Sequence, residues 1–305
     1  MHRFKHILVG VDLSEDDRFV SERPAPPSEA AIQRAVSLAK ANSARVLFMH
    51  VLDSSSIVIP TELGDIETLR VSAQEVLQGL VEHARAEGVE ADGKVVVGKS
   101  WLELIRQVLR DKHDLLISGT RRMGTFRSML FGSTGMKLLR LCPCPVWLTE
   151  PQPEKISSIL VAHDLQPVGD LAMELGCSMA ALNDAQLHVV HSICYPEMAE
   201  ALPARTSSGT VKDYRALADK HISKQLESYN LKNDAIVHLE AGSAYLQILN
   251  AVERHRIDVL VMGTVARTGI AGFVTGNTAE RLLPHIPCSV IAVKPPGFQS
   301  PVDLD

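Results

Sequence analysis

The sequence has little of what several large classes of protein require. Its 305 residues include 5 cysteines and 4% aromatic residues, and 36 acidic residues outnumber 31 basic ones, for a formal net charge of -5. Without an excess of positive charge the chain has no general attraction for a phosphate backbone, so we expect no nucleic-acid partner. No apolar run approaches the roughly 20 residues of a membrane-spanning helix, and the N-terminal residues pass directly into a strand pattern without a signal peptide. We therefore expect a cytoplasmic protein.

Motifs for metal binding and for nucleophilic catalysis are also missing. The cysteines form no C-x-x-C pair and lie at no zinc-ligand spacing from a histidine, so we expect reduced, buried thiols. His50 and His191 fall late in apolar strand patterns, where packing or hydrogen bonding is the expected role. His188 lies three residues from His191, and so on the opposite face of the same strand. The segment 119–125 has the glycine spacing of a P-loop, but a threonine replaces the lysine. We expect neither a bound metal nor a catalytic residue.

The chain repeats itself. Short runs of Val, Ile and Leu alternate with longer amphipathic stretches, which is typical of βα units around a buried parallel sheet. The segment DLLISGT at 114–120 is answered by DVLVMGT at 258–264. Three pairs of residues share the same separation of 144 positions: Gly119 and Gly263, Gly132 and Gly276, and Cys144 and Cys288. This constant offset predicts two copies of one domain.

Each copy is predicted to have the order β-α-β-α-β-α-β-α-β. We place the domains at 1–150 and 155–296, with a tail at 297–305, because the prolines of the segment 150–155 interrupt regular structure. The first copy has 11 extra residues, which we assign to a proline-rich loop at 18–28. The strands expected in the first copy are 5–12, 44–51, 93–98, 114–119 and 145–149. The helices expected there are 28–41, 65–88, 100–112 and 133–141.

In an open parallel sheet, ligands bind beyond the carboxyl ends of the strands, where the winding reverses. Asp12, Val51 and Gly119 are predicted to end three of these strands. The segment Gly132-Ser133-Thr134 opens the last helix, whose free N–H groups attract anions such as phosphate. The same segment is also typical of a plain turn and helix cap, and a carboxylate such as Asp12 often caps a loop. The arginines after the fourth strand, including Arg122, either bind phosphate or form a solvated face.

These residues resemble the nucleotide-binding signature of the universal stress protein family, G-x2-G-x9-G-[ST]. Gly119, Gly132 and Ser133 fit it, whereas Arg122 replaces its second glycine. In the second copy, Gly263 and Gly276 fit, Ala266 replaces the second glycine, and Asn277 replaces the first hydroxyl residue before Thr278. The resemblance covers nearly the whole chain twice, and the second half is most similar to the tandem group E of that family.

The resemblance implies an α/β fold of two tandem doubly wound domains. Each is a five-stranded parallel sheet of order 3-2-1-4-5, flanked by helices. It also implies ATP in the crevice of the first domain. Asp12 and the backbone of Val51 would meet the adenine, Gly119 would lie against the ribose and phosphates, and Gly132, Ser133 and Thr134 would hold phosphate oxygens. The corresponding positions in the second domain are Asp164, Gly263, Gly276, Asn277 and Thr278.

Three functions follow from this reading. The leading one is a stress-response regulatory protein that binds a nucleotide without significant catalysis. The alternative is a lipid-like or other apolar ligand in the second domain, whose nucleotide pattern is degenerate and whose segment 195–209 has no counterpart in the first. The third is a weak ATPase. By the same resemblance, the fifth strands near 145–149 and 288–293 would pair within one chain as a pseudo-dimer. This pairing leaves a pseudo-symmetric monomer, and the association of two chains as a homodimer stays open.

Overall fold

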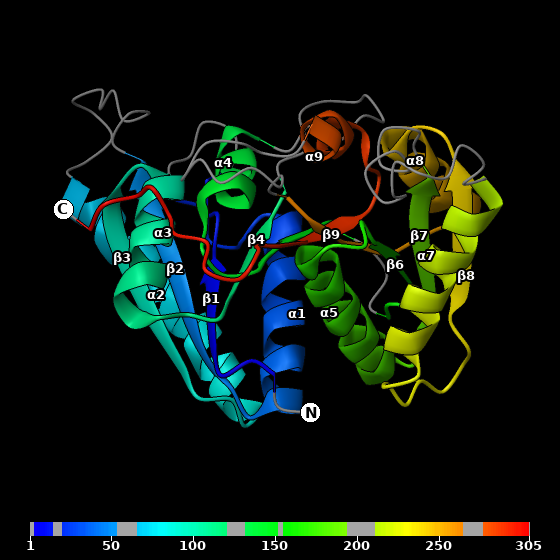
Figure 1. Cartoon of the computed structure of the whole chain (residues 1–305). Coiled ribbons are helices and arrows are strands. Elements are labelled where there is room, and N and C mark those ends of the chain that lie inside the picture. The colour runs from blue at the N-terminus through cyan, green and yellow to red at the C-terminus, as the bar shows by residue number, and fades with distance from the viewer. Residues whose placement is uncertain are drawn as a thin grey trace. The chain divides into compact units, whose positions relative to one another are not determined.

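Two compact units make up the part of the chain that is described by the computed structural model (Figure 1). The described residues are 3–14, 20–53, 66–120, 132–151, 155–193, 211–264 and 277–304. The first unit, here called the first domain, includes the described residues up to 151 together with 299–304. The second domain extends from 155 to 298.

The first domain is a five-stranded parallel sheet with two helices on each face. Its strand order is β3-β2-β1-β4-β5. The strands are β1 (His6–Gly10), β2 (Arg45–Asp53), β3 (Ala91–Gly98), β4 (Leu115–Gly119) and β5 (Val146–Thr149). The helices are α1 (Pro26–Asn42), α2 (Ile66–Ala86), α3 (Ser100–Asp111) and α4 (Ser133–Leu141). Figure 1 shows α1 and α4 on opposite sides of β4.

The second domain repeats this arrangement. Its strand order is β8-β7-β6-β9-β10, again all parallel. The strands are β6 (Ser158–Ala162), β7 (Gln186–Ile193), β8 (Ile236–Ala241), β9 (Val259–Gly263) and β10 (Ser289–Val293). The helices are α5 (Pro167–Asn183), α7 (Val211–Leu226), α8 (Ala244–Arg254) and α9 (Asn277–Leu282), followed by the 3-10 turn η1 (Leu283–His285). Figure 1 shows α5 and α9 on opposite sides of β9.

The sheets form where the sequence has short apolar runs. The central strands are buried on both faces because helices cover a parallel sheet on each side. Ile7, Leu8, Ile117 and Leu260 are examples of fully buried residues in these strands. The predicted elements of the first domain agree with the observed ones within two residues. The four cysteines among the described residues are free and buried, as expected for structural thiols, and burial raises the pKa of Cys177 to about 12.

Corresponding helices begin and end in the same way. α1 and α5 each have a proline in the first turn, where its missing N–H costs nothing. Both end at a residue in the left-handed conformation, Ser43 with φ 51° and Asp184 with φ 56°. The prediction of a loop over 18–28 was therefore wrong at its end: Pro26, Pro27 and Ser28 form the first turn of α1, since proline is compatible with that position.

An aspartate ties together the starts of two neighbouring strands in each domain. The Asp114 carboxylate accepts hydrogen bonds from the backbone N–H groups of Lys5 at 2.6 Å and His6 at 3.1 Å. The Asp258 carboxylate accepts the same pair from Ser157 at 2.7 Å and Ser158 at 3.0 Å. These charge-assisted bonds fix the register of the two central strands.

The C-terminal residues lie on α3 of the first domain. The Arg106 guanidinium donates to the carbonyl of Asp303 at 3.1 Å, and the Arg110 guanidinium donates to that of Leu304 at 3.1 Å. Within the described part of the chain, every helix is too short or too polar to cross a membrane.

Candidate functional site

The carboxyl edge of the first sheet brings most of the predicted site residues together. β1 ends at Gly10 and β4 ends at Gly119, and the two strands are neighbours with Gly10 opposite Ser118. The order of strands reverses between them, because the chain winds outward through β2 and β3 on one side and through β5 on the other. This is the place where a doubly wound sheet opens to a ligand.

The sequence predicted that Val51 ends its strand. This was wrong, because β2 continues to Asp53. β2 therefore extends past β1, whose last paired residue, Gly10, lies opposite Met49. The Met49 carbonyl accepts a hydrogen bond from the Val11 N–H at 2.9 Å and so faces β1. Backbone groups two residues apart on a strand point to the same side. The N–H and C=O of Val51 are thus directed to the space beyond the end of β1.

Asp12 and Asp164 each close a turn. The Ser14 backbone N–H donates to Asp12 Oδ1 at 3.0 Å, and the Ser14 hydroxyl donates to the same oxygen. The Gln166 N–H donates to Asp164 Oδ1 at 3.0 Å. Both are Asx turns, the local capping role considered from the sequence. The Asp12 N–H in turn donates to Ser28 Oγ at 3.0 Å, which joins this loop to the start of α1.

The first glycine of each signature segment makes a close contact with a helix. A Cβ at Gly119 would lie 2.4 Å from the carbonyl carbon of Pro27, so the first turn of α1 packs directly on the end of β4. A Cβ at Gly263 would lie 2.8 Å from the Val168 side chain of α5. The absence of a side chain at these two positions is required by helix-to-strand packing, whether or not a ligand is bound.

The helix starts that follow the signature differ between the domains. Gly132 is the N-cap of α4, and its first turn, which contains Ser133 and Thr134, has neither an acidic residue nor a side-chain cap. α9 has only 6 residues and carries Glu280 in its first turn. Because the positive end of the helix dipole is partly compensated by a nearby carboxylate, α4 is better suited to an anion than α9.

Each domain has a buried ionisable side chain at the carboxyl edge of its sheet, acidic in the first domain and basic in the second. Thr120 follows β4, and its hydroxyl donates to the Glu150 carboxylate. In the second domain, Lys294 Nζ donates to the Thr264 hydroxyl at 2.5 Å. Glu150 is 4% exposed and Lys294 7%. Sequence reasoning missed this pair, although the 144-residue offset that aligns Thr120 with Thr264 also aligns Glu150 with Lys294.

A histidine from the second strand of each domain supports the loop after the first strand. His50 Nδ1 lies 2.9 Å from the Val11 carbonyl, and His191 Nδ1 lies 2.9 Å from the His163 carbonyl. Burial lowers the pKa of both histidines, so Nδ1–H is the donor and each Nε2 is an acceptor. His191 Nε2 accepts from the Tyr214 hydroxyl at 3.2 Å, whereas His50 Nε2 is buried without a partner among the described residues. These are the structural roles predicted for His50 and His191.

The second domain has its own polar network on the α5 and α7 face. His163 Nε2 lies 3.2 Å from Gln225 Oε1 and 3.3 Å from Asp170 Oδ1. His221 Nε2 lies 3.0 Å from the same oxygen of Asp170. Burial lowers the pKa of His163 although Gln225 and Asp170 favour its protonated form. The network fixes α7 to α5 near the start of the loop that contains Asp164.

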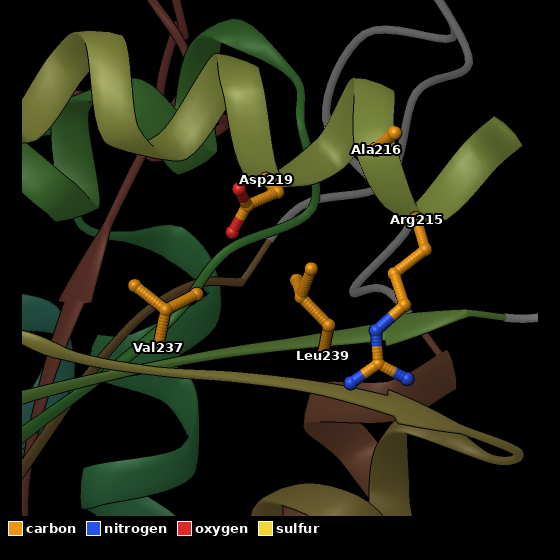
Figure 2. A pocket seen from close by; sticks show the side chains of 5 residues that line it. All are labelled: Arg215, Ala216, Asp219, Val237 and Leu239. Carbon is orange, nitrogen blue, oxygen red and sulfur yellow. The ribbon is translucent and has the colours of Figure 1, made fainter. Parts of the chain in front are cut away.

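A hollow of about 350 Å³ lies between α7 and β8 (Figure 2). Figure 2 shows Val237 and Leu239 rising from β8 toward α7, with Asp219 and Arg215 extending from the helix. The floor is apolar, but the rim carries one anion and one cation. This lining does not favour the lipid-like ligand considered for the second domain.

Several predicted residues lie outside what the structure describes: Arg122, Gly276 and the segment 195–209, together with the side chain of Asn277. Thr278 lies in the first turn of α9 and is half-buried. The described residues thus bring together Asp12, Val51, Gly119 and the start of α4 along one edge of the first sheet.

Comparisons with known proteins agree with this architecture. The model of the universal stress protein family matches residues 3–150 and 155–294. Universal stress protein E of Photorhabdus laumondii is 25% identical over an alignment of 322 residues including gaps, which covers 99% of this chain and 98% of that protein. Universal stress protein E of Escherichia coli K12 is 26% identical over 328 residues, covering 100% and 98%. The crystal structure of PA1789, a functionally unknown protein from Pseudomonas aeruginosa, is similar in fold with a TM-score of 0.70 and 22% identity, over 96% of this chain and 94% of that one.

Proposed function

Because the chain belongs to the universal stress protein family, we propose that it is a stress-response regulatory protein whose first domain binds an adenine nucleotide, ATP in the first instance, without significant turnover. The observation that carries the proposal is the start of α4. Gly132, Ser133 and Thr134 open a 9-residue helix whose first turn has no acidic residue and no side-chain cap. The N–H groups of such a turn are donors for phosphate oxygens.

The base is assigned to the space beyond the end of β1. The N–H and C=O of Val51 are directed there, and this pair of groups matches the donor and acceptor on one edge of adenine. The Asp12 carboxylate lies in the loop that borders the same space. Val51 and Asp12 are therefore assigned to the adenine, and the start of α4 to the phosphates.

The second domain is assigned no nucleotide. α9 is short and has Glu280 in its first turn, which weakens the attraction for a phosphate. Lys294 acts in the opposite sense, but its ammonium group is buried and bonded to Thr264. The charges next to the helix start therefore favour phosphate binding in the first domain over the second.

Isothermal titration calorimetry of the full chain with ATP and magnesium tests the proposal. We expect saturable binding that is lost in Gly132→Asp, because the new carboxylate occupies the helix start and repels phosphate. Gly276→Asp is the matched control and is expected to bind ATP like the parent. Absence of binding at millimolar ATP, or loss of binding in Gly276→Asp alone, would contradict the assignment. Steady release of phosphate during the titration would contradict the absence of turnover.

A further inference from the structure

Three histidines from separate elements meet in the second domain. His188 is on β7, His238 is on β8, and His255 is the C-cap of α8. His188 Nδ1 lies 3.0 Å from His238 Nε2. The ring centroids are 5.3 Å apart for His188 and His238, and 4.6 Å apart for each of these with His255. One ring nitrogen from each residue lies within 4.8 Å of the others.

The strand register explains why the rings converge. β7 and β8 pair with Val190 opposite His238. His188 is two residues from Val190, so His188 and His238 lie on the same face of the sheet. Val237 lies on the other face, where it lines the hollow under α7 (Figure 2). α8 packs on β7 from the histidine side, and its C-terminus places His255 over the other two rings.

Burial favours the neutral form of His188 and His238. Burial, followed by the charges of His255 and His238, lowers the pKa of His188 to about 4. Burial also lowers the pKa of His238, although Glu240 acts in the opposite sense. His188 is 5% exposed, and the other two rings are half-buried. Neutral imidazoles at pH 7 present lone pairs, which is the form that binds metal ions.

We propose that His188, His238 and His255 form a binding site for one divalent transition-metal ion, zinc in the first instance, with water as the fourth ligand. In a tetrahedral zinc site the ligand nitrogens are about 3.3 Å apart and the centroids of the three rings are about 5 Å apart. The observed separations of 4.6 and 5.3 Å match this triangle. Coordination of a metal ion by His188 Nδ1 and His238 Nε2 would replace the hydrogen bond that joins these two nitrogens.

The site lies away from the carboxyl edge of the second sheet. His188 and His238 are each the third residue of their strand, and α8 runs back from the carboxyl edge, so His255 lies toward the amino edge. A metal there joins two neighbouring strands to the helix that covers them. Its expected effect is on the stability of the second domain, because binding to the folded chain stabilises it by mass action.

The group formed by His163, Asp170 and His221 is the natural comparison. Its ligand atoms also lie within 4.8 Å of one another. There, however, both ring nitrogens of His163 are engaged, because Nδ1 accepts from the Leu165 N–H at 3.0 Å and Nε2 faces oxygens of Gln225 and Asp170. This group therefore supplies a control for the proposed site.

The test uses the full chain without a polyhistidine tag, freed of metal with a chelator and dialysed. Zinc is titrated in competition with a chromophoric chelator, and cobalt binding is followed by its visible absorption. We expect one ion per chain and an intense tetrahedral cobalt spectrum. His238→Gln and His255→Gln are each expected to weaken zinc binding by about a hundredfold or more, whereas His221→Gln and the exposed His83→Gln leave it unchanged.

The thermal midpoint of the parent chain gives a readout that needs no variant. Zinc is expected to raise it, and magnesium, which prefers oxygen ligands, is not. Absence of saturable zinc binding would overturn the proposal. Binding that survives both His238→Gln and His255→Gln, or that is lost in His221→Gln, would overturn it as well.

Discussion

Glu150 and Lys294 occupy the same position in the two domains, 144 residues apart, and each is buried and hydrogen-bonded to the threonine that follows the fourth strand of its domain. One copy thus carries a carboxylate, and the other an ammonium group, at the carboxyl edge of its sheet. The two domains share a fold and differ in the charge next to the place where a ligand would bind.

Removing the Glu150 charge should strengthen nucleotide binding. Glu150→Gln keeps an acceptor for Thr120 and eliminates a negative charge near the phosphates. A charge at the edge of a partly solvated crevice contributes on the order of 0.5 to 1 kcal/mol, so the Kd for ATP should fall about two- to fivefold. Calorimetric titration of the variant and of Lys294→Gln, which should not change the Kd, measures the effect. A weaker affinity in Glu150→Gln would disprove this electrostatic role.

Gly119 should tolerate no side chain. In Gly119→Ala the new Cβ would lie 2.4 Å from the carbonyl carbon of Pro27, and backbone cannot move aside as a side chain can. We expect the free energy of unfolding to decrease by about 1 to 3 kcal/mol. Gly79→Ala, in the interior of α2 with nothing within 4 Å of its Cβ, should instead increase it by about 0.5 to 1 kcal/mol. Urea denaturation compares the two, and equal effects would refute the packing argument.

The aspartates that tie the central strands should matter for stability in both domains. Asp114→Asn and Asp258→Asn each weaken two charge-assisted bonds to backbone N–H groups. A loss of about 1 to 2 kcal/mol is expected in each. Asp92→Asn removes only an exposed ion pair with Arg85 and should change stability by less than about 0.5 kcal/mol. A similar loss of stability in all three variants would show that the hydrogen bonds of Asp114 and Asp258 to the backbone contribute no more than an exposed ion pair.

The Tyr214 hydroxyl should stabilise the second domain through His191. Tyr214→Phe leaves His191 Nε2 buried without its donor, at an expected cost of about 1 to 2 kcal/mol. A double-mutant cycle with His191→Phe isolates the pair, and we expect a coupling of about 1 kcal/mol. Additive effects of the two substitutions would mean that this hydrogen bond contributes nothing.

Acid should destabilise the protein below about pH 6.5, the ordinary histidine pKa. Burial lowers the pKa values of His50, His163 and His191 in the folded chain. Above pH 6.5 these rings are neutral in both states, so their contribution is complete there. As the pH falls from 6.5 through the lower folded pKa values, the unfolded chain binds protons that the folded chain does not, and stability is lost.

Urea denaturation at about pH 7.5 and about pH 5 measures this loss. His163→Gln should reduce the dependence on pH, because one of the titrating groups is removed. His83→Gln, at an exposed position, should leave it unchanged. An unfolding free energy that rises toward pH 5 in the parent chain would contradict the assignment.

Much of the fold could be predicted from the sequence because the pattern occurs twice. Similar apolar runs at the positions of β1 and β6, together with the constant 144-residue offset, indicate that one unit is repeated. A buried parallel sheet with right-handed connections then allows few other topologies. The start of α1 is the exception, because a polar segment with three prolines is typical of a loop. The first turn of a helix accepts them, since its N–H groups have no partner inside the helix.

The candidate site was less accessible from sequence. Gly119 was interpreted as a place for the ligand, but contact with the backbone of Pro27 already requires a glycine there. The spacing of His188 and His191 argued against a metal site, since it places them on opposite faces. His188 instead meets His238 and His255, which come from β8 and α8. Such a meeting depends on strand register and on the length of a helix, which no local pattern encodes.

We propose that one of the two similar domains binds a nucleotide. Equilibrium dialysis of the purified full chain against labelled ATP measures the number of nucleotides bound per chain at saturation. We expect one nucleotide per chain, reduced to none by Gly132→Asp and unaffected by Gly276→Asp. A stoichiometry of two, or of none, would contradict the proposal.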